Sequence, residues 1–356
     1  MGRFKHFINI IILVALSTVG LRFLFEYIFA LPIAASAEAG PIDTLFDFHY
    51  WMIALLFSLI MVLMIYAVFV FRRADDDETD GPHIHGNKKL EVAWTIVPTF
   101  FVIGLGIWGA IALNEITRPK QGEMVVDVIG KQWVWSFKYP EQDSITSGEL
   151  VLPINRTIVL KMNAEDVIHS FWVPEFRVKQ DLVPGRETTL RITPTMAGNY
   201  RLRCAEICGL NHTLMEADVR VVSAEEFQAW VDEKSAAPAF ADMTPEQRGA
   251  YWASAEGFGC VACHSQDGTS SVGPTWQGLY GHEAQLADGS TVTVDDEYIA
   301  TAIHDPNAQI VAGFNPNIMP QNYVEQFTAR EQEISTAEAI DLDIAADLIA
   351  FIKTLQ

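Results

Sequence analysis

Four cysteines carry the clearest chemical signal in this sequence, because they occur as two close pairs. Cys204 and Cys208 are separated by three residues in the run CAEICGLNHTLM, which continues to His212 and Met215. Thiolate and thioether sulfur are soft ligands and imidazole is borderline, a combination that suits copper. Two thiolates exceed the needs of a mononuclear blue-copper site and could bridge two copper ions. The run therefore predicts a binuclear copper centre.

A second histidine ligand must come from elsewhere in the chain. His169, in DVIHSFWVP, is the only other histidine in the strand-rich region that contains the run. A zinc site is an alternative, but zinc would leave Met215 without a role. A disulfide between Cys204 and Cys208 is another alternative, and it would leave the histidines without a role. We therefore expect His169 to join the copper ligands.

The second cysteine pair has the spacing Cys-x-x-Cys-His, at which c-type haem is attached. Cys260 and Cys263 would form the two thioether bonds, and His264 would bind the iron. A redox-active thiol pair is the alternative, but the adjacent histidine and the lack of a surrounding βαβ pattern disfavour it. The motif predicts covalently bound haem c.

An electron-transfer haem needs a sixth ligand, and methionine raises its potential. Met319, in NIMPQN, is the only methionine after His264. His282 and His304 are the other candidates, and we expect both to be surface residues. Met319 is therefore the predicted axial ligand.

Three apolar stretches precede residue 118 and could cross a membrane. The first runs from Phe7 to about Ile33 and contains Arg22 and Glu26. Its uncharged part also suits a signal-peptide core, with residues 35–37 as a candidate cleavage site. However, Arg22 and Glu26 are four residues apart and can pair on one helical face. We therefore expect a retained helix.

The second and third stretches, 48–71 and 94–113, form a predicted transmembrane hairpin. Three glycines in the third stretch would allow close approach to other membrane helices, although a hairpin surrounded only by lipid is the alternative. Four Lys and Arg residues lie in the loop between the stretches, and the positive-inside tendency places that loop in the cytoplasm. We expect a multi-pass protein of a bacterial-type plasma membrane, with the region after residue 117 on its outer face.

The region from 123 to 222 contains short segments rich in β-branched and aromatic residues, separated by Gly, Pro or Asn. Several antiparallel strand candidates within about 100 residues predict a β-sandwich or barrel. A short helix and an Ala/Pro linker follow. From about Thr244 the pattern indicates helices joined by long loops.

The charge distribution excludes one class of partner. The formal net charge is −21, and after residue 223 the chain has 21 Asp and Glu against four Lys and Arg. Such a surface repels nucleic acid, so we exclude nucleic-acid binding. It would attract a cationic partner, unless it only maintains solubility.

The sequence resembles cytochrome c oxidase subunit II of the type with a C-terminally fused cytochrome c domain. The resemblance lies in the Cys-x-Glu-x-Cys-x3-His-x2-Met run, the upstream His-Ser and VPGR, and it covers roughly residues 41–223. It implies a cupredoxin-like domain with a CuA centre. The implied copper ligands are the side chains of His169, Cys204, Cys208, His212 and Met215, and the backbone carbonyl of Glu206.

The resemblance assigns roles to further residues. The Glu206 carboxylate would help hold a magnesium ion at the interface with the catalytic subunit. Glu91 would lie at the mouth of a proton path, with a helix-start carboxylate as the alternative. Pro274, in GPTW, would accept the free N–H of the proximal His264.

A tryptophan motif completes the implied site. Trp133 and Trp135 are two residues apart and would face one side of a strand, where a packed aromatic core is the alternative. By the resemblance, Trp133 is an exposed tryptophan at the surface where electrons enter.

The expected fold class is therefore a multidomain membrane protein with N-terminal transmembrane α-helices, a cupredoxin-like β-sandwich and a C-terminal all-α c-type cytochrome domain. The predicted boundaries are 1–40 for the first apolar helix, 41–120 for the hairpin, 121–223 for the CuA domain, 224–245 for the helix and linker, and 246–356 for the cytochrome c domain.

The expected function is electron transfer within a haem–copper terminal oxidase. Electrons would pass from a donor through haem c and CuA to the catalytic subunit I, which reduces O2 to water with proton translocation. The donor would be cytochrome c or a neighbouring quinol-oxidising membrane complex, and other oxidase subunits would be partners. A related nitric oxide reductase and a membrane-tethered electron carrier are the alternatives, whereas a quinol oxidase subunit would lack the copper ligands.

Overall fold

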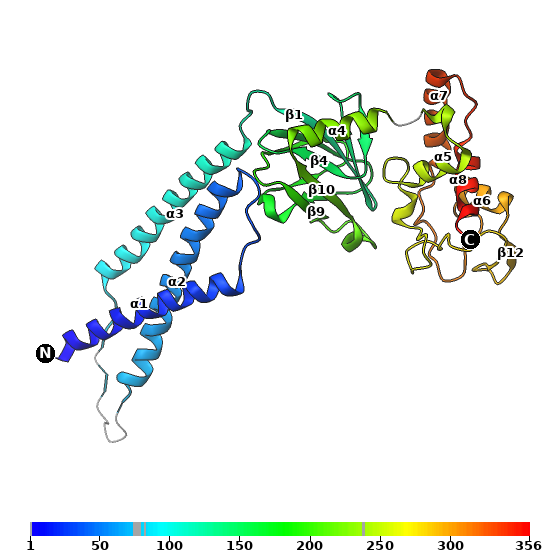
Figure 1. The fold of residues 1–356 in the computed structure, drawn as a ribbon. Coiled ribbons are helices and arrows are strands. Elements are labelled where there is room, and N and C mark those ends of the chain that lie inside the picture. Colours follow the sequence, from blue (N-terminus) through cyan, green and yellow to red (C-terminus); the bar gives the residue numbers. More distant parts are fainter. Residues whose placement is uncertain (1, 74–79, 82, 237–238) are drawn as a thin grey trace. The chain divides into compact units, whose positions relative to one another are not determined.

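The computed structural model describes residues 2–73, 80–81, 83–236 and 239–356, which form two compact units divided after Pro119. In the first unit the described residues form three long helices (Figure 1). All three are long and apolar enough to cross a membrane. The helices are α1 (Gly2–Ile28), α2 (Ala39–Val70) and α3 (Lys88–Thr117).

Polar contacts join α1 to α2. The Ser58 hydroxyl donates to the Ser17 hydroxyl at 3.0 Å. Arg22 pairs with Glu26 at 3.1 Å, as the spacing predicted, and also with Asp47 of α2. Charged groups within apolar helices are costly unless they are paired, so this cluster fixes the two helices against each other.

Aromatic contacts join α2 to α3. The Phe48 ring stacks on Phe101 with centroids 6.0 Å apart and meets Trp108 edge-on. On α3, an added Cβ at Gly104, Gly106 or Gly109 would have no atom of the described residues within 4 Å. These glycines therefore do not serve packing against the described part of the chain.

The second unit begins with a sandwich of two five-stranded sheets, as predicted (Figure 1). One sheet has the order β3-β2-β1-β5-β8 and the other β4-β10-β9-β6-β7. The first sheet comprises β1 (Met124–Lys131), β2 (Val134–Tyr139), β3 (Ile145–Ser147), β5 (Ile158–Ala164) and β8 (Thr188–Ile192). The second comprises β4 (Leu150–Pro153), β6 (His169–Trp172), β7 (Lys179–Leu182), β9 (Gly198–Cys204) and β10 (Glu216–Val222).

The strand pattern predicted antiparallel pairing, but two of the strand pairs are parallel. β1 pairs with β5 in parallel, and β4 pairs with β10 in parallel. Alternation of side chains shows which face is buried but carries no information about strand direction. Along β1 the burial alternates strictly, so one face of the sheet supplies the core.

One helix covers part of the sandwich. Helix α4 (Ala224–Ser235) begins with a capping box, in which Ser223 and Glu226 satisfy each other's backbone N–H groups. Its Trp230 packs against Tyr139 with ring centroids 4.9 Å apart. Residues 237 and 238 of the predicted linker lie outside the described residues.

The C-terminal region is helical, as predicted, with one short two-stranded ribbon added. Its helices pack around an apolar core that includes Trp252, Phe327 and Leu348. Gly249 lets α5 approach α8 closely, because a Cβ there would lie 2.0 Å from the Asp347 carbonyl oxygen. The elements are α5 (Pro245–Ala253), η4 (Cys260–Ala262), β11 (Glu283–Gln285), β12 (Thr291–Thr293), α6 (Asp296–His304), α7 (Tyr323–Glu338) and α8 (Ile344–Thr354).

A buried ion pair holds α5 to α8. Two guanidinium nitrogens of Arg248 donate to the two Asp347 carboxylate oxygens at 2.8 Å each, and Trp252 Nε1 donates to the same carboxylate. Asp347 is only 2% exposed. The substitution Arg248→Met would leave this carboxylate buried and unpaired.

We expect Arg248→Met to destabilise the C-terminal region by about 3–5 kcal/mol. Thermal unfolding of the purified chain, followed by limited proteolysis of residues 239–356, would measure the loss. Lys353→Met is the matched control. It removes an ion pair with Asp296, which is 60% exposed, and should cost far less, because water screens exposed ion pairs. Equal effects of the two substitutions would contradict the prediction.

Candidate metal centre and adjoining cavity

Neighbouring strands of the second sheet bring the predicted copper ligands together. β6 begins at His169, β9 ends at Cys204, and the two strands pair so that Phe171 lies opposite Cys204. The loop from 205 to 215 contains Cys208 and a short 3-10 helix, η2 (His212–Leu214), and returns into β10. Residues 35 positions apart in sequence therefore meet at one end of the sheet.

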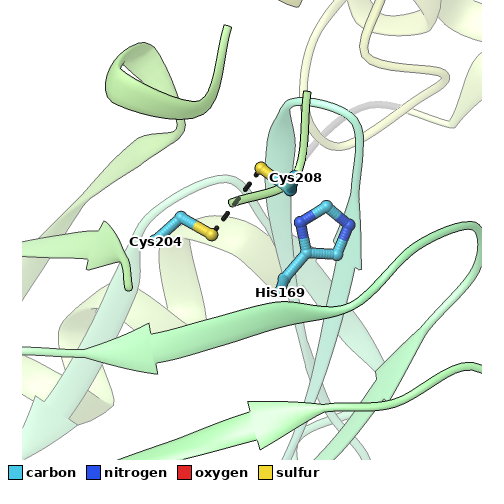
Figure 2. Close-up of side chains that lie close together, drawn as sticks. All are labelled: His169, Cys204 and Cys208. Atoms are coloured by element: carbon cyan, nitrogen blue, oxygen red, sulfur yellow. Dashed lines mark hydrogen bonds between the residues drawn. The ribbon is translucent and has the colours of Figure 1, made fainter. Parts of the chain in front are cut away.

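The sulfur and imidazole atoms lie close enough to bind metal. Cys204 Sγ and Cys208 Sγ are 3.7 Å apart (Figure 2). Cys208 Sγ is 3.5 Å from His212 Nδ1 and 3.8 Å from Met215 Sδ. Ligand atoms of His169, Cys204 and Cys208 all lie within 4.8 Å of one another, and all three residues are buried.

Asp166 orients the His169 ring. Its carboxylate accepts a hydrogen bond from His169 Nε2 at 2.8 Å and others from the backbone N–H groups of Gln132 and Val167. The opposite ring atom, His169 Nδ1, is buried and has no hydrogen-bond partner among the described residues. Such an orphaned atom beside two thiols fits a metal ligand, because buried polar atoms otherwise find partners.

The electrostatics of the cluster favour a bound cation. The hydrogen bond between the thiols lowers the pKa of Cys204 to about 3 and raises the pKa of Cys208. Burial lowers the pKa of His169, but the hydrogen bonds with Asp166 and Cys204 and the charges of both groups together outweigh it and raise the pKa to about 8. The two thiols thus share one proton in the metal-free chain. Metal binding would displace that proton and the one on His169.

Glu206 lies beside the cluster through its backbone. Its carbonyl oxygen is 3.2 Å from Cys204 Sγ. The residue itself is exposed. Apolar side chains at the loop tip are also exposed: Ile207 84%, Leu210 63% and Leu214 68%.

Trp133 departs from the prediction. It is buried, at 7% exposure, rather than exposed, and it does not share a strand face with Trp135. Lys131 pairs with Val134, so Gln132 and Trp133 form the turn between β1 and β2. Trp133 Nε1 donates to the Cys208 carbonyl at 3.1 Å, and Trp135 Nε1 donates to the Met215 carbonyl at 3.3 Å.

A cavity of about 500 Å³ adjoins this site in the same unit. Cys260, Cys263, His264 and Met319 all line it. The rest of its wall is largely apolar, as binding sites for large planar cofactors require. Residues of the β-sandwich complete the wall: Lys131, Gln132, Trp133, Glu165 and Asp166.

The His264 ring is fixed from two sides. Its Nδ1 lies 2.8 Å from the Pro274 carbonyl oxygen, and the ring stacks on Trp276 with centroids 5.1 Å apart. Gly273 allows this approach, because a Cβ there would lie 2.7 Å from Cε1 of the ring. Burial lowers the pKa of His264. The imidazole is therefore neutral and can offer Nε2 to a metal.

The two cysteines of this motif are unsuited to thiol redox chemistry. Burial raises the pKa of Cys260 to about 12 and that of Cys263 to about 11. Redox-active thiols instead have lowered pKa values. Both thiols are free. His282 and His304 are exposed and do not line the cavity.

The remaining predicted residue, Glu91, lies in the first turn of α3. Its carboxylate accepts a hydrogen bond from the Asn87 backbone N–H at 3.0 Å, and the Asn87 side chain accepts from Leu90. This is the reciprocal arrangement of a helix cap. Sequence reasoning missed Asp166 and Gln132, although an acidic residue three positions before His169 was a usable signal.

The fold and site define a membrane-anchored β-sandwich protein with a sulfur–imidazole metal centre. Residues 145–222 match the family "Cytochrome C oxidase subunit II, periplasmic domain", and residues 25–110 match "Cytochrome C oxidase subunit II, transmembrane domain". The chain belongs to the cytochrome c oxidase subunit II family. It is therefore a subunit of a haem–copper terminal oxidase, and its family implies a CuA site at the cluster.

Two named relatives agree with this assignment. Cytochrome c oxidase subunit 2 of Synechocystis sp. is 34% identical, over 68% of this chain and 90% of the relative. The protein of the same name from Thermostichus vulcanus is 34% identical, over 56% of this chain and 77% of the relative. The crystal structure of the periplasmic domain of subunit II of cytochrome oxidase from Bradyrhizobium japonicum is 32% identical. It covers 33% of this chain and 96% of that one, with a TM-score of 0.32.

Asp166 should control copper affinity although it is not itself a predicted ligand. We expect Asp166→Ala to weaken copper binding by about 10–100-fold, because the His169 ring loses the partner that orients it. Copper titration of the metal-free chain, followed by copper absorbance, would measure this. Glu165→Ala is the control, since Glu165 contacts Lys131 at 3.8 Å rather than a ligand. Equal copper affinity in the two variants would contradict the role given to Asp166.

Proposed function

We propose that this chain receives electrons at a covalent haem c in its C-terminal region and delivers them through CuA to the catalytic subunit. That subunit reduces O2 to water with proton translocation. The observation that carries the proposal is the shared cavity. Its wall contains Cys260, Cys263 and His264 of the haem-attachment motif, together with Met319. It also contains Trp133, which donates a hydrogen bond to the copper loop, residues 205–215.

Four residues of the cavity would hold the haem, and Pro274 would orient one of them. Cys260 and Cys263 would carry the thioether bonds. His264, held by the Pro274 carbonyl, and Met319 would be the axial ligands. When bound, haem c and the copper pair supply one-electron carriers.

Six groups from the loop at 205 to 215 and from the adjoining strands β6 and β9 would hold the metal pair. Their arrangement agrees with the short contacts among the sulfurs and imidazoles and with the orphaned His169 Nδ1. They are the side chains of His169, Cys204, Cys208, His212 and Met215 and the backbone carbonyl of Glu206.

The tip of the same loop would dock on the catalytic subunit I. Three large apolar side chains exposed at the tip are typical of a surface that another protein covers. The exposed Glu206 carboxylate lies among them and would help hold a magnesium ion at that interface. Electrons would leave the copper pair through this contact.

The membrane part would anchor the chain beside other oxidase subunits. The open surface at the three α3 glycines leaves room for a neighbouring helix. With the basic loop in the cytoplasm, the sandwich and the C-terminal region would lie on the outer face of a bacterial-type plasma membrane. Glu91, at the cytoplasmic end of α3, would then lie at the mouth of a proton path.

The donor would be a cationic cytochrome c or a neighbouring quinol-oxidising complex. The acidic excess after residue 223 supports a cationic surface on that donor. Association should then weaken as ionic strength rises.

A haem-stained denaturing gel of the purified oxidase complex, with mass spectrometry of this band, tests the proposal. Covalent haem on the peptide that contains Cys260 and Cys263, and co-purification with a polytopic haem protein, are the expected results. A band without attached porphyrin would remove the haem step from the function.

Met319→Ala should lower the haem potential and open the iron to external ligands, because methionine ligation raises the potential. Redox titration and carbon monoxide binding by the reduced complex would measure both effects. Met196→Ala, an exposed position of the sandwich, is the control and should change neither. An unchanged potential in Met319→Ala would rule out this axial ligand.

A further inference from the structure

Asn211 connects the two metal-binding motifs of the chain. It lies in the copper loop immediately before His212 and is 7% exposed. Its side-chain Nδ2 donates a hydrogen bond to the Ala262 carbonyl at 2.9 Å. Ala262 lies between Cys260 and Cys263, so the contact joins the copper loop directly to the haem-attachment segment.

Both ends of this hydrogen bond are held rigidly. The Asn211 carbonyl accepts from the backbone N–H groups of Leu214 and Met215 at 2.9 and 3.1 Å, within the turn that presents His212. On the other side, Ala262 N–H donates to the Gly259 carbonyl at 3.0 Å, closing the 3-10 turn of the motif. A displacement at one end would therefore be transmitted to a predicted metal ligand.

The surrounding contacts bring the same segment onto the sandwich. Gly259 has φ +71°, and a Cβ there would lie 2.7 Å from Val134 Cγ1 of β2. Ser136 donates its hydroxyl hydrogen bond to the Ala255 carbonyl. At the far edge, Lys131 Nζ lies 3.3 Å from Gln326 Oε1 of α7. Among these contacts, the hydrogen bond from Asn211 is the one whose acceptor lies within the Cys-x-x-Cys-His motif.

From these contacts we propose that Asn211 is a positioning residue that fixes the haem-attachment segment against the copper loop. It would thereby set the rate of electron transfer between the haem and the copper pair. The inference rests on the proposed function for its electron-transfer part. Electron transfer from the haem to the copper pair is a one-electron step. The ferrous haem iron becomes ferric, the copper pair gains the electron, and no proton moves and no bond forms or breaks.

The side-chain chemistry explains the choice of variants. Asn211→Asp keeps the size but directs a carboxylate at the Ala262 carbonyl, so a buried acceptor loses its donor and faces a like partial charge. Asn211→Leu removes the donor without adding charge. Asn199→Asp is the matched control, because Asn199 is exposed on β9 of the same domain.

The experiment uses the purified oxidase complex with each of these variants. Hydrogen–deuterium exchange reports the amides of residues 255–265, and rapid photochemical reduction of the haem reports the rate of electron transfer to copper. Haem and copper contents and the copper electron paramagnetic resonance spectrum are measured on the same samples. The exchange measurement does not depend on electron transfer.

We expect Asn211→Asp and Asn211→Leu to raise hydrogen–deuterium exchange in residues 255–265 by about tenfold or more, because a buried hydrogen bond is lost. Both variants should also slow electron transfer from haem to copper while retaining their metal contents. Asn199→Asp should match the wild type. Unchanged exchange in both Asn211 variants, raised exchange with an unchanged transfer rate, or loss of copper in both variants would overturn the proposal. Absence of haem from the wild-type chain would instead refute the proposed function, while exchange would still test the contact.

Discussion

The separation of 3.7 Å between the Cys204 and Cys208 sulfurs constrains the whole second unit. Two thiols at this distance do not readily ionise together, because their negative charges repel, and a bound cation would stabilise the arrangement. Cys204 is fixed as the last residue of β9, and His169 as the first of the neighbouring β6. The two sheets therefore serve to hold three donor groups at one edge, where an otherwise unfavourable arrangement becomes a binding site.

A second layer of hydrogen bonds keeps the loop in place. Trp133 and Gln132 both donate to the Cys208 carbonyl, and Trp135 donates to the Met215 carbonyl. Asp166 holds the turn at Gln132 as well as the His169 ring. Residues of β2 and of the turn before it, together with Asp166 between β5 and β6, thus determine where the sulfurs lie. This network also explains why Trp133 is buried, because its indole N–H is directed inwards to the loop.

The sequence predicted the helices, the sandwich and the cysteines of the metal cluster, since each follows from local spacing, whereas His169 was expected only as the remaining histidine of the strand-rich region. The apolar stretches, the Cys-x3-Cys run and the Cys-x-x-Cys-His motif all lie within short segments. It could not predict the parallel pairing of β1 with β5, because strand direction depends on contacts distant in sequence. The sequence pattern placed Trp133 on a strand. The turn between β1 and β2 consists of Gln132 and Trp133, so no Gly or Pro marks it. The contributions of Asp166 and Asn211 were invisible for a similar reason, since each acts through a partner that only the fold brings near.

The cavity wall built from both the sandwich and the C-terminal region has a consequence for assembly. Cys260 and Cys263 face a space that Trp133 and Asp166 help to enclose. In the proposed function, haem would have to reach these thiols before the C-terminal region packs against the sandwich. Attachment of the cofactor would then be the first step in the maturation of the chain, and the packing of the two regions against each other the second.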